Sequence, residues 1–175
     1  MKAVRFLGRW WVVVGLLASV AMLATAHAFQ TFGGFAPCHL CLKQRDIYWF
    51  AIAVSLPASV WALFFRSRGT PRLAAFLLFA IFAAGAIIAT FHAGVELKWW
   101  EGPKTCTGGG SMASVDTAAM QALLGGAKQA IPMCDVVVWK YLGLSMAGWN
   151  AIVSAVLAVL SLIASTRRRD ERRGA

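Results

Sequence analysis

The stretch LAAFLLFAIFAAGAIIATFH, residues 73–92, decides the fold of this chain. It contains no Asp, Glu, Lys or Arg, and its length is close to the roughly 20 residues that an α-helix needs to cross the hydrocarbon core of a bilayer. Three further runs share both properties, at about residues 10–29, 47–65 and 147–165. The pattern predicts an all-α membrane protein, a bundle of four transmembrane helices in a single membrane domain over residues 1–175.

The composition argues against an ordinary soluble domain. Hydrophobic residues make up 59% of the chain and charged residues only 14%. An average globular chain has about 45–50% hydrophobic and about 25% charged residues. A soluble protein with so large a helical core would need far more polar chain to cover it. Within the second run, Pro57 predicts a kink rather than a break, because neighbouring groups can satisfy the freed carbonyl.

The net charge of +10 is concentrated beside the apolar runs. Three basic residues precede the first run, three lie between the second and third, and five follow the fourth, which makes eleven of the 17. The other six are spread through two longer connections, at about 30–46 and 93–146. The positive-inside rule therefore places both termini in the cytoplasm and both longer loops outside. Because each basic cluster adjoins a hydrophobic run, we expect no nucleic-acid binding.

The N-terminus has some features of a secretory signal. Basic residues and an apolar stretch precede Ala26-His27-Ala28, which resembles a cleavage site. The apolar stretch is long for a signal, however, and it begins with Trp10-Trp11, a pair typical of an interfacial anchor. We expect this run to remain as the first transmembrane helix.

All four cysteines fall in the two predicted outer loops. Cys38 and Cys41 lie in the first, and Cys106 and Cys134 lie in the second. Confinement to the oxidising side of the membrane predicts disulfide chemistry. Four cysteines allow three pairings, and the spacing alone does not choose among them.

Cys38-His39-Leu40-Cys41 is a C-x-x-C motif expected to open the second helix. At a helix N-terminus, free backbone N–H groups stabilise a thiolate, the attacking species in disulfide exchange. Arg45 follows Cys41 by four residues and therefore lies on the same helix face. Its guanidinium could hold Cys41 as a thiolate and hydrogen-bond the carbonyl oxygen of a redox ligand. The alternative is a snorkelling arginine paired with Asp46.

The segment between Cys106 and Cys134 contains glycine clusters at 108–110 and 125–126 and a predicted short helix at about 116–124. The apolar face of that helix would lie on the bilayer surface. A disulfide closing this segment would either staple a loop or present an exchangeable bond on a mobile tether.

A metal site is a competing interpretation of the same thiols. The candidate ligands of a tetrahedral zinc are Cys38, His39, Cys41, His92, Cys106 and Cys134. A single C-x-x-C lacks the second close-spaced pair typical of such sites, and thiols outside the cytoplasm tend to oxidise. We therefore expect no resident metal. Leu42 follows the motif where covalent c-type haem requires histidine, which excludes that cofactor.

His92 lies at the predicted outer end of the third helix. A histidine there can exchange a proton near neutral pH, as a two-electron, two-proton redox step requires. A histidine facing lipid headgroups is the alternative. Four tryptophans near the same boundary are expected to form an aromatic belt, although some could wall a ligand pocket. They are Trp99, Trp100, Trp139 and Trp149.

Together, these motifs resemble the disulfide bond formation protein B family over the chain from about Pro37 to the fourth helix. The motifs that carry the resemblance are Pro37-Cys38-His39-Leu40-Cys41 with Gln44-Arg45, His92-Ala93-Gly94-Val95-Glu96, Gly102-Pro103 with Cys106, and Cys134 with Trp139 and the segment 142–150. Two positions differ from the usual family pattern. Gln44 stands where many members have a glutamate, and Gly148 lies at or near a position where many members have a proline.

The resemblance implies a protein-disulfide oxidoreductase of the bacterial inner membrane. Such a thiol oxidase re-oxidises a periplasmic DsbA-like thioredoxin-fold carrier and passes the electrons to ubiquinone or menaquinone. It implies that Cys38 and Cys41 form the quinone-linked pair and that the carrier attacks Cys106, whose partner is Cys134.

The resemblance also implies which side chains contact the quinone. Arg45 falls at the family's quinone-contacting arginine, and Gln44 and His92 are further candidates. Two other functions are compatible with the sequence. A structural four-span protein would use its disulfides only as braces. A vitamin-K-epoxide-reductase-like enzyme also links thiols to a quinone. In such an enzyme the C-x-x-C motif lies later in the chain, so the early Cys38 and Cys41 argue against this alternative.

Overall fold

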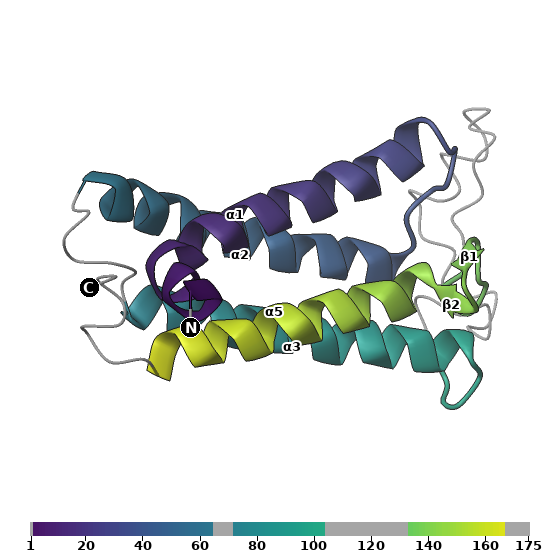
Figure 1. The fold of residues 1–175 in the computed structure, drawn as a ribbon. Coiled ribbons are helices and arrows are strands. Elements are labelled where there is room, and N and C mark those ends of the chain that lie inside the picture. Colours follow the sequence, from purple (N-terminus) through teal and green to yellow (C-terminus); the bar gives the residue numbers. More distant parts are fainter. Residues whose placement is uncertain (1, 65–71, 104–132, 167–175) are drawn as a thin grey trace.

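The computed structural model describes residues 2–64, 72–103 and 133–166 (Figure 1). Within these ranges, four helices are long and apolar enough to cross a membrane. They are α1 (Lys2–Thr31), α2 (His39–Phe64), α3 (Arg72–Glu96) and α5 (Met146–Thr166). The predicted four-helix membrane fold is confirmed.

The helices extend beyond the apolar runs that predicted them. α2 begins at His39, within the C-x-x-C motif that was expected to open it, and precedes the apolar run at about 47–65. Hydropathy alone does not show this start, because the first two turns of α2 carry polar side chains. α2 also continues through Pro57, which agrees with the expectation that this proline does not break the helix.

Small side chains make up much of the interior of the bundle. Ala51, Ser55 and Ala58 lie on the buried face of α2, and Phe82 and Leu78 of α3 fill the space between helices. Large apolar side chains instead cover the outside, among them Trp49, Phe50, Phe64, Leu73 and Ile87. Small residues let membrane helices approach closely, while lipid solvates the large ones. The arrangement is therefore that of a bundle surrounded by hydrocarbon.

The helices pack as two neighbouring pairs. α1 lies along α2, and α3 lies along α5, with α2 and α3 joining the pairs (Figure 1). α1 and α5 make few contacts with each other. α1 ends, α2 begins, α3 ends and α5 begins on the same side of the bundle, which is termed the cysteine end.

A short hairpin that the sequence did not predict precedes α5. β1 (Lys140–Tyr141) and β2 (Leu144–Ser145) pair antiparallel through a two-residue turn. Leu142 and Gly143 have φ of 51° and 81°, and positive φ at both positions is typical of a type I′ hairpin. Ser145 then caps α5, because its Oγ accepts the Gly148 N–H at 3.1 Å. The predicted short helix at about 116–124 lies outside the described residues.

Candidate functional site

Cys38 caps the N-terminus of α2. Its Sγ accepts the backbone N–H of Cys41 at 3.2 Å, and its carbonyl accepts the N–H of Leu42 at 3.1 Å. This is the geometry of an N-cap residue and its third helical partner. It brings the Cys38 and Cys41 sulfurs to 2.7 Å, with both residues as free thiols. The prediction that the motif opens the second helix is confirmed.

The two thiols differ in environment. Cys38 is only 4% exposed, whereas Cys41 is partly exposed. The hydrogen bond with the Cys41 thiol, together with burial, raises the pKa of Cys38. Both effects favour the protonated form of Cys38.

Cys134 lies directly against this pair. It is 1% exposed and packs with Cys38 and Leu40 in one buried cluster. Cys134 is also disulfide-bonded, and its predicted partner, Cys106, lies outside the described residues. An ion pair of 2.5 Å between Lys98 Nζ and Asp135 Oδ2 ties the next residue to the end of α3. A cysteine of the second predicted pair is thus adjacent to the first pair.

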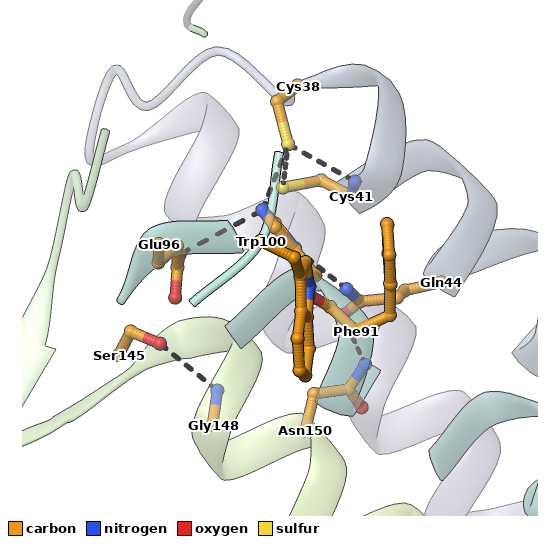
Figure 2. A network of polar contacts seen from close by, with 10 residues as sticks. Cys38, Cys41, Gln44, Phe91, Glu96, Trp100, Ser145, Gly148 and Asn150 are labelled. Atoms are coloured by element: carbon orange, nitrogen blue, oxygen red, sulfur yellow. Dashed lines mark hydrogen bonds and ion pairs between the residues drawn. The ribbon is translucent and has the colours of Figure 1, made fainter. Parts of the chain in front are cut away.

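His92 projects from α3 toward the thiols. Its Nε2 is 3.6 Å from Cys38 Sγ and 3.9 Å from Glu96 Oε1, one helical turn later. Figure 2 shows Glu96 below and to the left of Cys38 and Cys41. His92 is therefore positioned to exchange a proton with Cys38, and it does not face the headgroups.

A buried hydrogen-bond network from three helices holds His92 in place. Gln44 Nε2 of α2 donates to His92 Nδ1 at 2.9 Å, and Asn150 Nδ2 of α5 donates to Gln44 Oε1 at 2.5 Å (Figure 2). The Tyr48 hydroxyl donates to Asn150 Oδ1 and lies 3.0 Å from Ser154 Oγ. These partners restrict both the position and the rotation of the His92 ring.

A cavity of about 400 Å³ adjoins the thiols and this network. Ligand sites of this size bury most of a small organic molecule. Its polar lining includes Cys41, Gln44, Arg45, Tyr48, His92 and Asn150, and its apolar lining includes Met22, Leu23, Phe29, Val136, Trp139 and Trp149. The cavity therefore brings a redox-capable dithiol, a cation and an apolar wall together.

Arg45 lies at the wall of the cavity. Its guanidinium donates to Gln30 Oε1 at 2.6 Å and to the carbonyl oxygen of Ala26 at 3.0 Å. Both partners belong to α1, and the described contacts of Arg45 include no ion pair with Asp46. The contacts hold a positive charge one helical turn below Cys41.

The tryptophans divide between the two roles considered for them. Trp139 and Trp149 line the cavity. Trp99 is 69% exposed, whereas Trp100 stacks on Phe91 with 5.8 Å between ring centroids. Gly94 makes room for Trp100, because a Cβ there would lie 2.0 Å from the indole ring.

The structure adds residues that the sequence did not single out, chiefly Tyr48, Asn150 and Ser154. The available indication was the presence of Asn and Ser four residues apart in an apolar span, where polar side chains usually face protein rather than lipid. Tyr48 gave no comparable indication, since an interfacial tyrosine is common.

Comparison with known proteins identifies one family. Residues 8–164 match the model of the family described as disulfide bond formation protein DsbB. Disulfide bond formation protein B of Marinobacter nauticus is 32% identical, over 94% of this chain and 95% of its own. The proteins of that name from Methylococcus capsulatus and Polaromonas sp. are 32% and 28% identical, over 86% and 89% of this chain and 90% and 89% of their own.

No solved structure matches the chain. The family model covers most of its length, and the described helices carry a dithiol at one end of a membrane-type bundle. The chain therefore belongs to the DsbB family of disulfide bond formation proteins, and it is a multi-pass bacterial membrane protein with disulfide oxidoreductase activity.

Proposed function

We propose that this chain is a quinone-dependent thiol oxidase that re-oxidises a periplasmic DsbA-like thioredoxin-fold carrier. The observation that carries the proposal is the apolar cavity of about 400 Å³, whose wall includes both Cys41 and Arg45. The charge distribution supports placing the cysteine end on the periplasmic face of the inner membrane, with both termini in the cytoplasm.

The cavity suits a ubiquinone or menaquinone ring. Its apolar lining matches a ring and the start of an isoprenoid tail, and a guanidinium can donate to a carbonyl oxygen. A bound quinone would supply an acceptor for two electrons and two protons. Gln44 and His92 also line the cavity, so they are the other candidate contacts.

The relay would begin at the second cysteine pair. A thiolate of the reduced carrier attacks Cys106, which breaks the Cys106–Cys134 bond and forms a mixed disulfide. The second carrier thiol resolves it, so the carrier leaves oxidised and both cysteines are reduced. Cys134 then attacks Cys38 of a Cys38–Cys41 disulfide and releases Cys41. Cys106 completes the exchange by re-forming its bond to Cys134.

The packing of Cys134 against Cys38 supports this order, because direct exchange requires the attacking and attacked sulfurs to meet. After the exchange, Cys38 and Cys41 hold the two electrons. Cys41 and the Arg45 guanidinium both lie at the cavity wall. When the Cys38–Cys41 bond re-forms, the Cys38 proton must leave. His92 Nε2 lies 3.6 Å from Cys38 Sγ and can accept it once the Gln44 amide turns so that its oxygen receives the Nδ1 hydrogen.

Oxidation of a reduced thioredoxin-fold carrier tests the proposal. Purified protein in detergent is mixed with excess carrier, with and without ubiquinone or menaquinone. We expect multiple turnovers only with quinone, and one carrier disulfide formed per quinol. If the disulfides of the protein stay intact under excess reduced carrier, their role is structural bracing and the proposal fails.

Arg45→Leu should raise the apparent KM for quinone by about 10-fold to 100-fold, because a hydrogen bond to a charged group is worth about 1.5–3 kcal/mol. The measurement is the initial oxidation rate against quinone concentration. Lys43→Leu is the matched control, since Lys43 is an exposed cation of the same helix. An unchanged KM in Arg45→Leu would contradict the assignment of Arg45 as a quinone ligand.

A further inference from the structure

We propose that the reduced cysteine pair forms a zinc-binding site with His92 and Glu96, and that zinc bound there holds the protein in an inactive, reduced state. The donor atoms of Cys38, Cys41 and His92 all lie within 4.8 Å of one another. Thiolate sulfur and imidazole nitrogen are the preferred ligands of Zn²⁺ in proteins.

The spacing of the donors approaches that of a tetrahedral site. With Zn–S of about 2.3 Å and Zn–N of about 2.0–2.1 Å, sulfur and nitrogen ligands lie about 3.6 Å apart, and Cys38 Sγ is 3.6 Å from His92 Nε2. The two sulfurs are 2.7 Å apart, so Cys41 would move outward by about 1 Å to reach tetrahedral spacing. The adjoining cavity leaves space for that movement.

Glu96 lies outside this group of three donors, and its side chain would rotate toward the thiols to supply a fourth. Its side chain is 7% exposed, and its Oε1 lies 3.9 Å from His92 Nε2 (Figure 2). Its Oε2 is buried and has no hydrogen-bond partner among the described residues. A buried carboxylate oxygen without a partner is costly, and a divalent cation at the thiols would provide one.

Gln44 gives this site an outer hydrogen bond. Its amide contacts His92 Nδ1 at 2.9 Å while Nε2 faces the thiols. Metal-bound histidines usually donate the other ring N–H to such a neighbour. The amides of Gln44 and Asn150 can turn together, so that the Gln44 oxygen receives this hydrogen. The sequence included His92 among the candidate zinc ligands but argued against a metal, because the chain lacks a second close-spaced cysteine pair and thiols outside the cytoplasm tend to oxidise. His39, which is nearer to the motif in sequence, is exposed.

Zinc binding would compete with electron transfer for the same sulfurs. Coordination displaces the thiol protons and leaves both cysteines as thiolates, with no change in oxidation state. A Cys38–Cys41 disulfide has no thiolate to offer, so oxidation of the pair excludes the metal. The ion would therefore bind only the electron-loaded form and delay its re-oxidation.

Metal titration of the full chain tests the inference without carrier or quinone. The Cys106→Ala/Cys134→Ala variant, reduced and kept anaerobic in detergent, is titrated with Co²⁺ and then with Zn²⁺. We expect one equivalent of Co²⁺, with thiolate charge-transfer absorption and the intense visible bands of a tetrahedral complex, displaced by Zn²⁺. Oxidation of the remaining pair should abolish binding.

Two substitutions distinguish the four-ligand site from simple chelation by a dithiol. His92→Gln and Glu96→Gln should each lower zinc affinity by at least about 10-fold. Losing a residue that only hydrogen-bonds a metal ligand already costs about 10-fold to 100-fold, and losing a ligand itself should cost no less. His39→Gln should leave it unchanged, although His39 lies between the cysteines in sequence. Circular dichroism checks that each variant folds. If His92→Gln does not fold, the isosteric Glu96→Gln alone provides the test.

Absence of binding to the reduced protein would overturn the inference, as would affinity that survives both substitutions. Either result leaves the quinone-dependent oxidase proposal intact, because neither quinone nor carrier is present in the titration.

Discussion

Cys41→Ser is expected to abolish quinone-dependent oxidation of the carrier while still allowing a mixed disulfide between the carrier and Cys106. The variant loses the sulfur at the cavity wall, so electrons delivered by the carrier have no route to the quinone. The first exchange uses only Cys106 and Cys134, and it should proceed. Turnover is measured by quinol formation, and the mixed disulfide is measured on non-reducing gels with a carrier lacking its resolving cysteine.

Two further variants locate each step of the relay. Cys38→Ser should also abolish turnover, because a disulfide with Cys41 can no longer form, and it should trap the same complex. Cys106→Ser should eliminate the complex itself. If Cys41→Ser retained turnover, the Cys38–Cys41 pair would not be the link to the quinone. If the complex were missing in Cys41→Ser, the carrier would dock elsewhere.

The fold was predictable from hydropathy, because a long uncharged apolar run indicates a helix surrounded by lipid rather than by water. Four uncharged runs correspond to four described helices of membrane length. The boundary of α2 was not predictable by the same rule. The first turns of α2 carry the polar residues Lys43, Gln44, Arg45 and Asp46. Hydropathy therefore does not detect these turns, although the helix already begins at the C-x-x-C motif, with Cys38 as its cap.

The site was predictable only where its residues share one helix. Cys38, Cys41 and Arg45 follow from helical spacing within α2. The approach of Cys134 to Cys38 depends on the path of a loop, which spacing does not determine. His92 was recognised as a proton-exchanging candidate, but its contact with Cys38 depends on how α3 packs against α2.

Asn150→Leu should destabilise the protein by about 1–3 kcal/mol, because loss of a buried partner costs about 1–3 kcal/mol per unsatisfied group. Asn150 donates to Gln44 and accepts from Tyr48. The variant leaves the Gln44 carbonyl oxygen without that donor, while Tyr48 keeps its contact with Ser154. The free energy of unfolding is measured by SDS titration in mixed micelles, with helicity as the readout.

Ser59→Ala is the matched control for this substitution. Ser59 is also buried in the bundle, but its hydroxyl has no hydrogen-bond partner within the described residues. Removing an unpaired buried hydroxyl relieves a desolvation cost, so the stability should stay equal or rise slightly. Equal losses in Asn150→Leu and Ser59→Ala would mean that the network adds nothing beyond side-chain packing. A loss confined to Asn150→Leu would show that its hydrogen bonds hold α2 to α5 beside the thiols.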